Sequence, residues 1–204
     1  MKYILVLGDG MADEPIESLG GKTPLEAAST PLMDTLASAG EMGMVHTIPE
    51  GMSPGSDTAN LSVLGYNPKI YYTGRSPLEA LSIGAPMKDT DVVYRCNIVT
   101  LSEEEESFEE KRIIDHSSSE IDTADAEILL KAFVDEFEYE GYSFYAGTSY
   151  RHCLIWDKGQ VLPMTQPHDI LGHVIGPYLP GNEVFLQMMK KSYEILSKHP
   201  LNIE

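Results

Sequence analysis

The chain has 204 residues, a hydrophobic content of 42% and a formal net charge of −18 at pH 7. This length suits one good-sized domain or two small ones, and the negative charge argues against nucleic acid or an anionic membrane as a partner. No apolar run is long enough to cross a bilayer, and the N-terminal apolar run lacks a signal-peptide cleavage site. We therefore expect a soluble, cytoplasmic protein that acts on a small molecule; its oligomeric state is open.

The first predicted element is a strand over residues 3–7, an apolar run that ends at Gly8 and Asp9. A strand without polar alternation is typical of a parallel sheet covered by helices on both faces. Ligands of such sheets bind beyond the carboxyl ends of the strands. Asp9 is therefore a candidate ligand of a hard metal ion, or alternatively the acceptor of an Asx-turn.

The next elements complete a βαβ pattern. Thr23-Pro24-Leu25-Glu26 is a capping box with proline at the first helical position, and a second helix is expected from Pro31 to about Ala39. Its apolar residues recur at helical spacing, which predicts packing in the core. Residues 43–48 then form the second expected parallel strand, since a helix connects it to the first.

The stretch Pro54-Gly55-Ser56-Asp57 places a hydroxyl on a Pro-Gly turn directly before a predicted helix. Free N–H groups at a helix start bind phosphate well, so Ser56 is a candidate nucleophile that carries a phosphoryl group. The other interpretation is that Ser56 or Asp57 only caps the helix. The loop with Ser56 follows the second predicted strand and so reaches the same sheet edge as Asp9, which favours chemistry.

A further helix start follows, where Ser76 and Glu79 form a predicted capping box around a proline. Arg75 precedes this helix and is placed to meet an anion, unless it is an ordinary surface arginine. From about residue 88 the pattern changes to α+β. We place a domain boundary near residues 76–90.

The second part predicts strands and two long helices. Cys96 and Cys153 lie in apolar segments and are expected to be buried free thiols, and the glutamate run that begins at Glu103 is expected to be a solvated hairpin tip. Asp115-His116, followed by three serines, is a polar cluster at a strand end. The expected strands are residues 91–101, 112–115, 142–146 and 151–156, and the expected helices begin at Asp122 and near Asn182.

Arginines and histidines gather at strands and strand ends of this second part. Arg95 interrupts an apolar strand, which is costly unless its charge meets a partner. Arg151 and His152 begin a strand after a turn, and His168 and Asp169 lie on a loop. Each has a structural alternative: Arg95 could pair with an acidic neighbour, and His168 could cap a turn. Their gathering in so acidic a chain favours an anion pocket.

These motifs, taken in order, resemble the archaeal-type cofactor-independent phosphoglycerate mutases of the alkaline phosphatase superfamily. The resemblance implies an α/β fold: the N-terminal part of an alkaline-phosphatase-like parallel sheet with helices (residues 1–80), followed by an incomplete α+β substrate-binding cap domain (residues 81–204). The resembling segments are Gly8-Asp9-Gly10-Met11, Pro54-Gly55-Ser56-Asp57-Thr58-Ala59-Asn60-Leu61, Gly74-Arg75, Pro77-Leu78-Glu79-Ala80, Tyr94-Arg95-Cys96-Asn97, Tyr150-Arg151-His152 and Pro167-His168-Asp169.

The resemblance also implies an activity, the interconversion of 3-phosphoglycerate and 2-phosphoglycerate in glycolysis. It implies two divalent metal ions, Mn²⁺ or Mg²⁺, and no requirement for 2,3-bisphosphoglycerate. Asp9 would ligate a metal, and Ser56 would be both a metal ligand and the phosphoryl acceptor. The residues that the resemblance assigns to substrate binding are Arg75, Arg95, Arg151, His152, His168 and Asp169.

The length of the chain departs from that family, whose members continue for about as long again. One carboxylate and one hydroxyl cannot hold two metal ions that each want about six ligands. We therefore expect these 204 residues to be an N-terminal part of the enzyme, inactive alone. Two alternatives stay open: a phosphatase of the same superfamily, in which water takes the phosphate from Ser56, and a non-catalytic phosphate-binding module.

Overall fold

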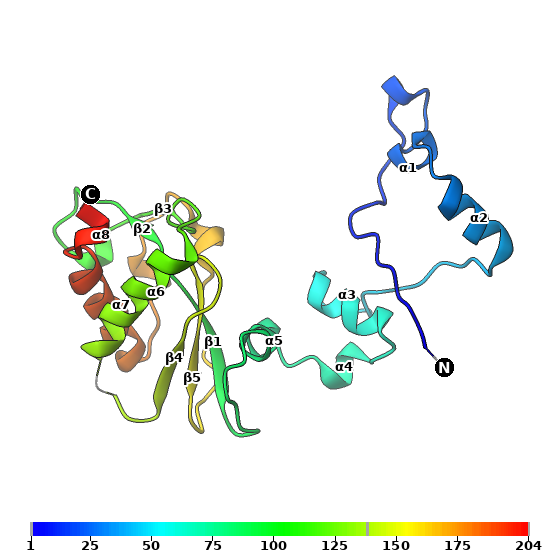
Figure 1. The fold of residues 1–204 in the computed structure, drawn as a ribbon. Helices are drawn as coiled ribbons and strands as arrows, with labels where there is room; N and C mark the ends of the chain where they lie inside the picture. The colour runs from blue at the N-terminus through cyan, green and yellow to red at the C-terminus, as the bar shows by residue number, and fades with distance from the viewer. Residues whose placement is uncertain (1, 138, 204) are drawn as a thin grey trace.

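The computed structural model describes residues 2–137 and 139–203. Figure 1 shows an N-terminal part of short helices and extended segments, and a C-terminal part in which helices pack against strands. Every named strand of the described residues lies at or after Val92. The first part therefore presents its functional groups from helices and loops, and the second part presents them from sheets.

The helices of the N-terminal part begin at the predicted signals. The capping box is confirmed, because the Thr23 N–H donates to Glu26 Oε2 at 2.8 Å and the Glu26 N–H donates to Thr23 Oγ1 at 3.2 Å. The helix predicted from residue 31 to 39 is also confirmed. The elements are η1 (Glu17–Leu19), α1 (Pro24–Ala27), α2 (Pro31–Ala39), α3 (Ser56–Val63), α4 (Pro68–Tyr71) and α5 (Arg75–Ser82).

The parallel sheet expected in the N-terminal part does not form in this structure. Residues 3–7 and 43–48 belong to no sheet, and Ile4 and Met44 are 90% and 101% exposed. A strand that is apolar on both faces needs neighbouring strands for its backbone groups and helices for its faces. The described residues supply neither. For the same reason the apolar face of α2 stays outside any core, with Leu32 81% exposed.

The α+β pattern expected in the second part is confirmed. Its main sheet has the order β1-β5-β4, with β5 pairing antiparallel to both neighbours. A second sheet pairs β2 with β3, so the return strand predicted near residues 112–115 is present. The strands are β1 (Val92–Asn97), β2 (Thr100–Leu101), β3 (Ile113–Asp115), β4 (Tyr142–Tyr145) and β5 (Arg151–Trp156).

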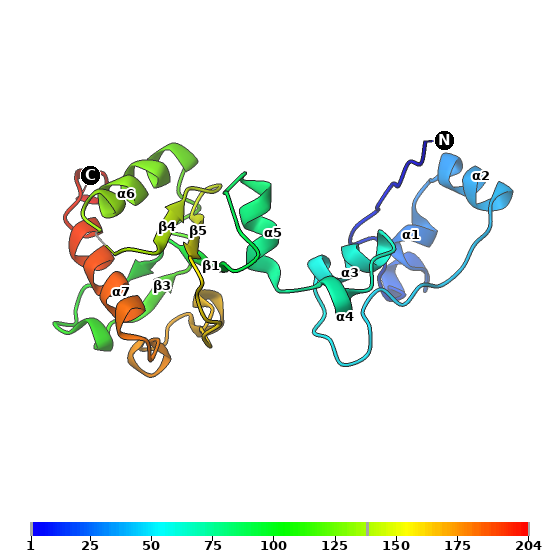
Figure 2. The same ribbon diagram turned by 90° about the horizontal axis from the view of Figure 1, so that it is seen from below.

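Helices cover both faces of the main sheet, as Figures 1 and 2 show. On one face, Phe133 of α6 (Thr123–Asp135) and Phe185 of α7 (Glu183–Leu196) pack with Leu154. On the other face, Ala80 of α5 packs with Cys153. Neighbouring residues of β5 thus point to opposite faces. The remaining elements are η2 (Phe108–Glu110), η3 (Pro167–Ile170), η4 (Gly176–Tyr178) and α8 (Pro200–Ile203).

Two smaller expectations from the sequence also have outcomes. Both cysteines are free thiols, Cys153 buried and Cys96 partly exposed. In the described part of the chain, no helix is both long enough and apolar enough to cross a membrane. The domain division at residues 80 and 81 stays a prediction; it falls inside α5, which packs on the main sheet through Ala80.

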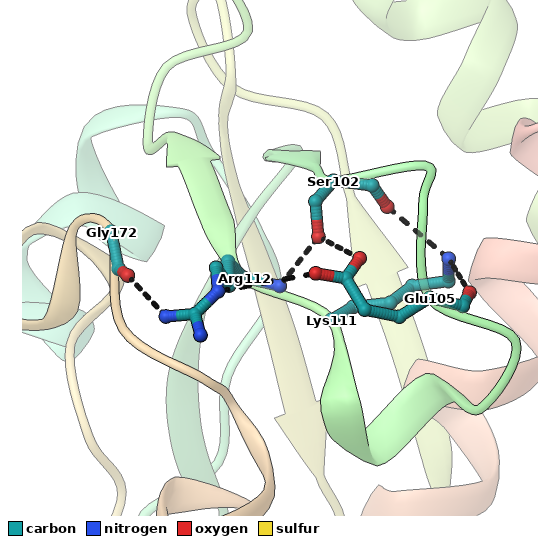
Figure 3. A network of polar contacts seen from close by, with 5 residues as sticks. All are labelled: Ser102, Glu105, Lys111, Arg112 and Gly172. Atoms are coloured by element: carbon teal, nitrogen blue, oxygen red, sulfur yellow. Dashed lines mark hydrogen bonds and ion pairs between the residues drawn. The ribbon is translucent and has the colours of Figure 1, made fainter.

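The acidic loop after β2 closes around a buried lysine (Figure 3). Lys111 is 3% exposed, and its Nζ donates to the carbonyls of Ser102 at 3.2 Å and Glu105 at 2.8 Å. Nζ also lies 4.9 Å from the centre of the Tyr193 ring. Beside it, Arg112 donates through Nη1 to the Gly172 carbonyl at 3.0 Å. The predicted hairpin tip is therefore anchored to the fold by one ammonium group.

We expect Lys111→Met to lower the free energy of unfolding by about 1.5–3 kcal/mol, because hydrogen bonds from a charged donor to two carbonyls are lost. Urea denaturation of the purified chain measures this. Lys131→Met is the matched control, since Lys131 pairs with Asp135 on the exposed face of α6 and such pairs contribute about 0.3–0.5 kcal/mol. Equal losses in the two variants would contradict an anchoring role for Lys111.

Candidate active site

Ser56 is the first residue of α3, and its side chain is exposed. The residue that caps this helix is Gly55, and no side chain makes the capping hydrogen bond. The hydroxyl of Ser56 is therefore not used by the helix end, contrary to the capping interpretation. It lines a pocket of about 270 Å³ together with Arg75, which reaches it from the start of α5. The remaining lining residues are Asp57, Leu78, Glu79 and Ser82.

Asp57, next to Ser56, is held by Tyr72, whose hydroxyl donates to the Asp57 carboxylate. Burial alone would raise the pKa of Asp57, but the hydrogen bonds from Tyr72 and from the Thr58 N–H lower it below the usual value. Burial and the same carboxylate raise the pKa of Tyr72 to about 12. Asp57 is therefore an ionised hydrogen-bond acceptor at neutral pH, and a carboxylate of low pKa is a poor general base. Its role is to hold the start of α3.

Arg75 lies at the start of α5, as predicted, but the capping box expected there is wrong. The residue that caps α5 is Gly74, with no side-chain hydrogen bond. Gly74 has a φ of 110°, a conformation that side chains disfavour. Glu79 instead accepts a hydrogen bond from Arg75 Nε at 2.7 Å. Glu79, which was predicted to complete a capping box, therefore forms an ion pair with Arg75 at the edge of the Ser56 pocket.

Arg95, Asn97 and Arg151 share one face of the main sheet. Asn97 lies opposite Arg151 in the antiparallel register, and Arg95 lies opposite Cys153. Cross-strand partners point to the same side, and Cys153 points toward α5. Both predicted arginines therefore belong to the α5 face. The Asn97 Oδ1 atom on that face is buried and has no hydrogen-bond donor among the described residues.

His152 points to the opposite face from Arg151, because the two are neighbours in β5. It is 1% exposed, and its Nδ1 accepts a hydrogen bond from the Gly147 N–H at 3.2 Å. Its Nε2 has no partner among the described residues. A Cβ at Gly147 would come within 2.2 Å of the Arg151 carbonyl oxygen, so this turn is tightly packed. The geometry makes His152 a support of the turn before Arg151, while direct substrate contact stays a prediction.

We expect His152 to make the chain sensitive to acid. Burial lowers the pKa of His152 to about 4 from 6.5, so the unfolded state binds its proton first as the pH falls. The free energy of unfolding should therefore drop by up to about 3 kcal/mol between pH 6.5 and 4 on account of this residue. Urea titrations at several pH values should show a shallower drop for His152→Asn than for the unaltered chain. The exposed His173→Asn is the control, and an unchanged slope in His152→Asn would contradict the assignment.

His168 and Asp169 in η3 lie at the edge of a ring cluster. His168 Nε2 is 3.6 Å from Asp169 Oδ1, and the His168 ring centre is 6.1 Å from that of His116. The His116 ring in turn meets the Tyr150 ring edge to face at 5.9 Å. The Arg151 guanidinium lies 5.0 Å from the centre of the same tyrosine ring. Two predicted residues, His168 and Arg151, are thus brought together through Tyr150 and His116.

The loop that presents His116 is strained. Residues 118–120 all have positive φ, between 48° and 58°, which costs about 1 kcal/mol or more for each non-glycine residue. The Asp115 carboxylate compensates by accepting hydrogen bonds from the N–H groups of Ser117 and Ser119, both at 2.7 Å. Sequence reasoning noted Asp115-His116 as polar but gave His116 no role. Asn97 was missed too, although it follows Arg95 by two residues and must share its face.

Asp9 is exposed, and no hydrogen bond or ion pair connects it to Ser56 in the described chain. Among the residues that the structure describes, no group of three or more His, Cys, Asp and Glu side chains is arranged to hold a metal ion. Asp9 and Ser56 together offer one carboxylate and one hydroxyl, whereas a divalent ion such as Mg²⁺ or Mn²⁺ prefers about six oxygen ligands. The donor set of this chain alone therefore does not fit two divalent ions.

The comparisons with known proteins agree with the motifs. The family model of 2,3-bisphosphoglycerate-independent phosphoglycerate mutase matches residues 37–202. The protein of that name from Methanosarcina barkeri is 47% identical over 208 residues, which cover 100% of this chain and 50% of the relative. The one from Methanosarcina acetivorans is 44% identical, covering 100% of this chain and 51% of the relative. The chain thus spans about half the length of the curated relatives it matches.

Two solved structures are similar as well. A protein from Pyrococcus horikoshii has 29% identity and a TM-score of 0.67, over 96% of this chain and 44% of that one. The cofactor-independent phosphoglycerate mutase from Thermoplasma acidophilum has 29% identity and a TM-score of 0.50, over 95% of this chain and 52% of that one. Since the family model covers most of the chain and the curated relatives match it from end to end, the chain belongs to the 2,3-bisphosphoglycerate-independent phosphoglycerate mutase family.

Proposed function

We propose that this chain is the nucleophile-bearing part of an enzyme that interconverts 3-phosphoglycerate and 2-phosphoglycerate through a phosphoserine at Ser56. One observation carries the proposal: the exposed hydroxyl of Ser56 and the guanidinium-bearing Arg75 line the same pocket. A guanidinium binds phosphate and carboxylate oxygens through paired hydrogen bonds. The pocket therefore offers a phosphoryl acceptor beside a group that holds phosphoryl oxygens.

The proposed transfer balances without an external phosphate donor. Ser56 Oγ forms a bond to phosphorus while the bond from phosphorus to the 3-oxygen of phosphoglycerate breaks, and the serine proton ends on that oxygen. Glycerate then reorients, and its 2-oxygen attacks the phosphoserine. The proton of the 2-hydroxyl returns to Ser56 Oγ. No 2,3-bisphosphoglycerate enters this sequence, in agreement with the family's name.

The second part of the chain is proposed to hold the glycerate. Arg95 and Arg151 stand on the sheet face that α5 covers, and the unpartnered Asn97 Oδ1 is an acceptor for a glycerate hydroxyl. His116 and His168 lie at the Arg151 end of this set, where a ring N–H group can donate a hydrogen bond to an anion. The two arginine charges matter because the chain carries a net charge of −18, which otherwise repels an anionic substrate.

We propose that Asp9 and Ser56 bind Mn²⁺ or Mg²⁺ together with ligands from outside the residues of this chain. A bound divalent ion would lower the pKa of the serine hydroxyl and neutralise phosphoryl oxygens. Two features support the need for a further polypeptide. Among the described residues the donor set is too small for two ions, and the apolar residues 4–7 belong to no sheet there. We expect the 204-residue chain to be inactive alone.

The test is an assay with Mn²⁺ and no 2,3-bisphosphoglycerate. It compares the chain alone with the chain joined to the part of the Methanosarcina barkeri relative that it leaves unmatched. We expect conversion of 3-phosphoglycerate to 2-phosphoglycerate only in the joined protein. An inactive joined protein that folds would remove the mutase proposal, and release of inorganic phosphate would favour a phosphatase. Activity of the chain alone would remove the need for a further polypeptide.

A further inference from the structure

Glu79 contacts two of the three arginines proposed to bind substrate. Its Oε1 accepts from Arg75 Nε at 2.7 Å, and its Oε2 lies 2.8 Å from Arg95 Nε. The second contact is an ion pair without hydrogen-bond geometry, since the buried Arg95 Nε has no aligned acceptor in the described chain. We propose that Glu79 is a positioning residue that sets both guanidiniums for one phosphoglycerate molecule; this inference rests on the proposed function.

The atoms used in these contacts leave the arginines free to bind. Each guanidinium has five N–H donors, of which one is on Nε and four are on the Nη atoms. Glu79 meets both arginines at Nε. Neither Arg75 nor Arg95 makes a hydrogen bond or ion pair through its Nη atoms within the residues described. The carboxylate thus fixes two guanidiniums while their outer edges stay available for an anion.

The position of Glu79 connects the two parts of the proposed site. It lies on α5, whose first residue is Arg75, beside Ser56 in the pocket. Arg95 stands on β1, against which α5 packs through Ala80. The Glu79 side chain is 24% exposed and that of Arg95 23%, so the ion pair is sheltered from solvent screening more than a surface pair. One side chain therefore ties the Ser56 pocket to the arginine face of the sheet.

The charge of Glu79 and its positioning of the arginines predict opposite effects of Glu79→Gln on substrate binding, which allows a test. The negative charge of Glu79 repels any nearby anion. If charge were its only effect, Glu79→Gln would therefore strengthen the binding of every anion. Positioning matters only for a ligand that needs both guanidiniums at once. Phosphoglycerate has a phosphate and a carboxylate at its two ends, whereas inorganic phosphate can be satisfied by one arginine. The ratio of the two affinities therefore reports positioning.

The experiment measures the dissociation constants of 3-phosphoglycerate and inorganic phosphate by calorimetry on the 204-residue chain and its Glu79→Gln variant. We expect the affinity for 3-phosphoglycerate to fall about tenfold, equivalent to losing one charge-assisted contact, with phosphate affinity unchanged or raised. Asp135→Asn is the matched control, because it breaks an i,i+4 ion pair on the exposed face of α6. Equal changes for the two ligands, or tighter binding of both, would overturn the proposal.

A ligand-free measurement separates this inference from the proposed function. In ¹H–¹⁵N spectra of the arginine Nε–H groups, the Arg75 signal should exchange slowly with water in the unaltered chain and rapidly in Glu79→Gln, because its hydrogen bond to Glu79 is lost. The Arg95 signal should change its chemical shift in the same variant, because its ion pair with Glu79 is lost. Glu79→Asp, whose side chain is too short by one methylene to span both arginines, should behave in the same way. If the unaltered chain does not bind 3-phosphoglycerate, the proposed glycerate site on Arg95 and Arg151 fails, whatever the spectra show. If exchange is unaffected by either substitution, the positioning role fails.

Discussion

Ser56→Ala is expected to lower the interconversion of 3-phosphoglycerate and 2-phosphoglycerate by at least about a thousandfold in the joined, Mn²⁺-loaded protein. The substitution removes the atom proposed to carry the phosphoryl group, which lines the pocket of about 270 Å³ together with Arg75. It should leave folding intact, because Ser56 is exposed and makes no capping hydrogen bond. A coupled assay for 2-phosphoglycerate measures the loss.

The matched control for this loss is Ser62→Ala. Ser62 lies on the same helix, and its hydroxyl donates only to the Thr58 carbonyl at 3.4 Å, so its activity should stay within about twofold of the unaltered protein. Intact-mass analysis after brief exposure to substrate gives a second measurement: one phosphoryl group on the unaltered protein and none on Ser56→Ala. Appreciable turnover by a well-folded Ser56→Ala protein would show that another atom is the nucleophile.

Arg95→Lys is expected to weaken 3-phosphoglycerate binding by about 10- to 100-fold, although the positive charge is kept. An ammonium group is a compact point charge, and it cannot contact Glu79 and the anion along two edges as the planar guanidinium can. Arg95 is 2.8 Å from Glu79 through Nε, so the lysine must give up one of the two partners. Calorimetry on the 204-residue chain measures the change.

Arg112→Lys is the control for Arg95→Lys. Arg112 lines a separate pocket with His173 and Tyr178 and donates to the Gly172 carbonyl, so its replacement should leave 3-phosphoglycerate affinity unchanged. Arg151→Lys should resemble Arg95→Lys, because Arg151 stands on the same sheet face. If the lysine variants at positions 95 and 151 bind as tightly as the unaltered chain, the α5 face of the sheet is not the binding surface.

Local signals in the sequence predicted local structure well. Thr23 and Glu26 form the predicted capping box because both partners lie within one helical turn. The helix that begins at Ser56 and the strand that begins at Arg151 were also placed correctly. Glu79 is the exception, since the partner that competes for its carboxylate, Arg95, lies on another element. Such a contact has no local signature.

The N-terminal apolar segments show why a strand pattern is not yet a strand. Residues 3–7 have the composition of a buried parallel strand, but Val6 is 87% exposed because no neighbouring strand pairs with it in the described structure. Strand formation depends on hydrogen-bond partners that are distant in sequence or in another polypeptide. The sequence pattern predicts that a segment favours the strand conformation, and the strand forms only where a neighbouring strand pairs with it.

The sequence by itself determined the family of this protein and its candidate nucleophile, because these depend on residue types in a fixed order: Ser56 after a Pro-Gly turn, and Arg95 within an apolar strand. Only the tertiary structure decided which candidates share a surface. The antiparallel register of β1 and β5 puts Arg151 on the face of Arg95 and sends His152 into the core. Packing of α5 on that sheet then brings Glu79 to Arg95. Register and packing are set by contacts between residues far apart in the chain, and no local pattern encodes them.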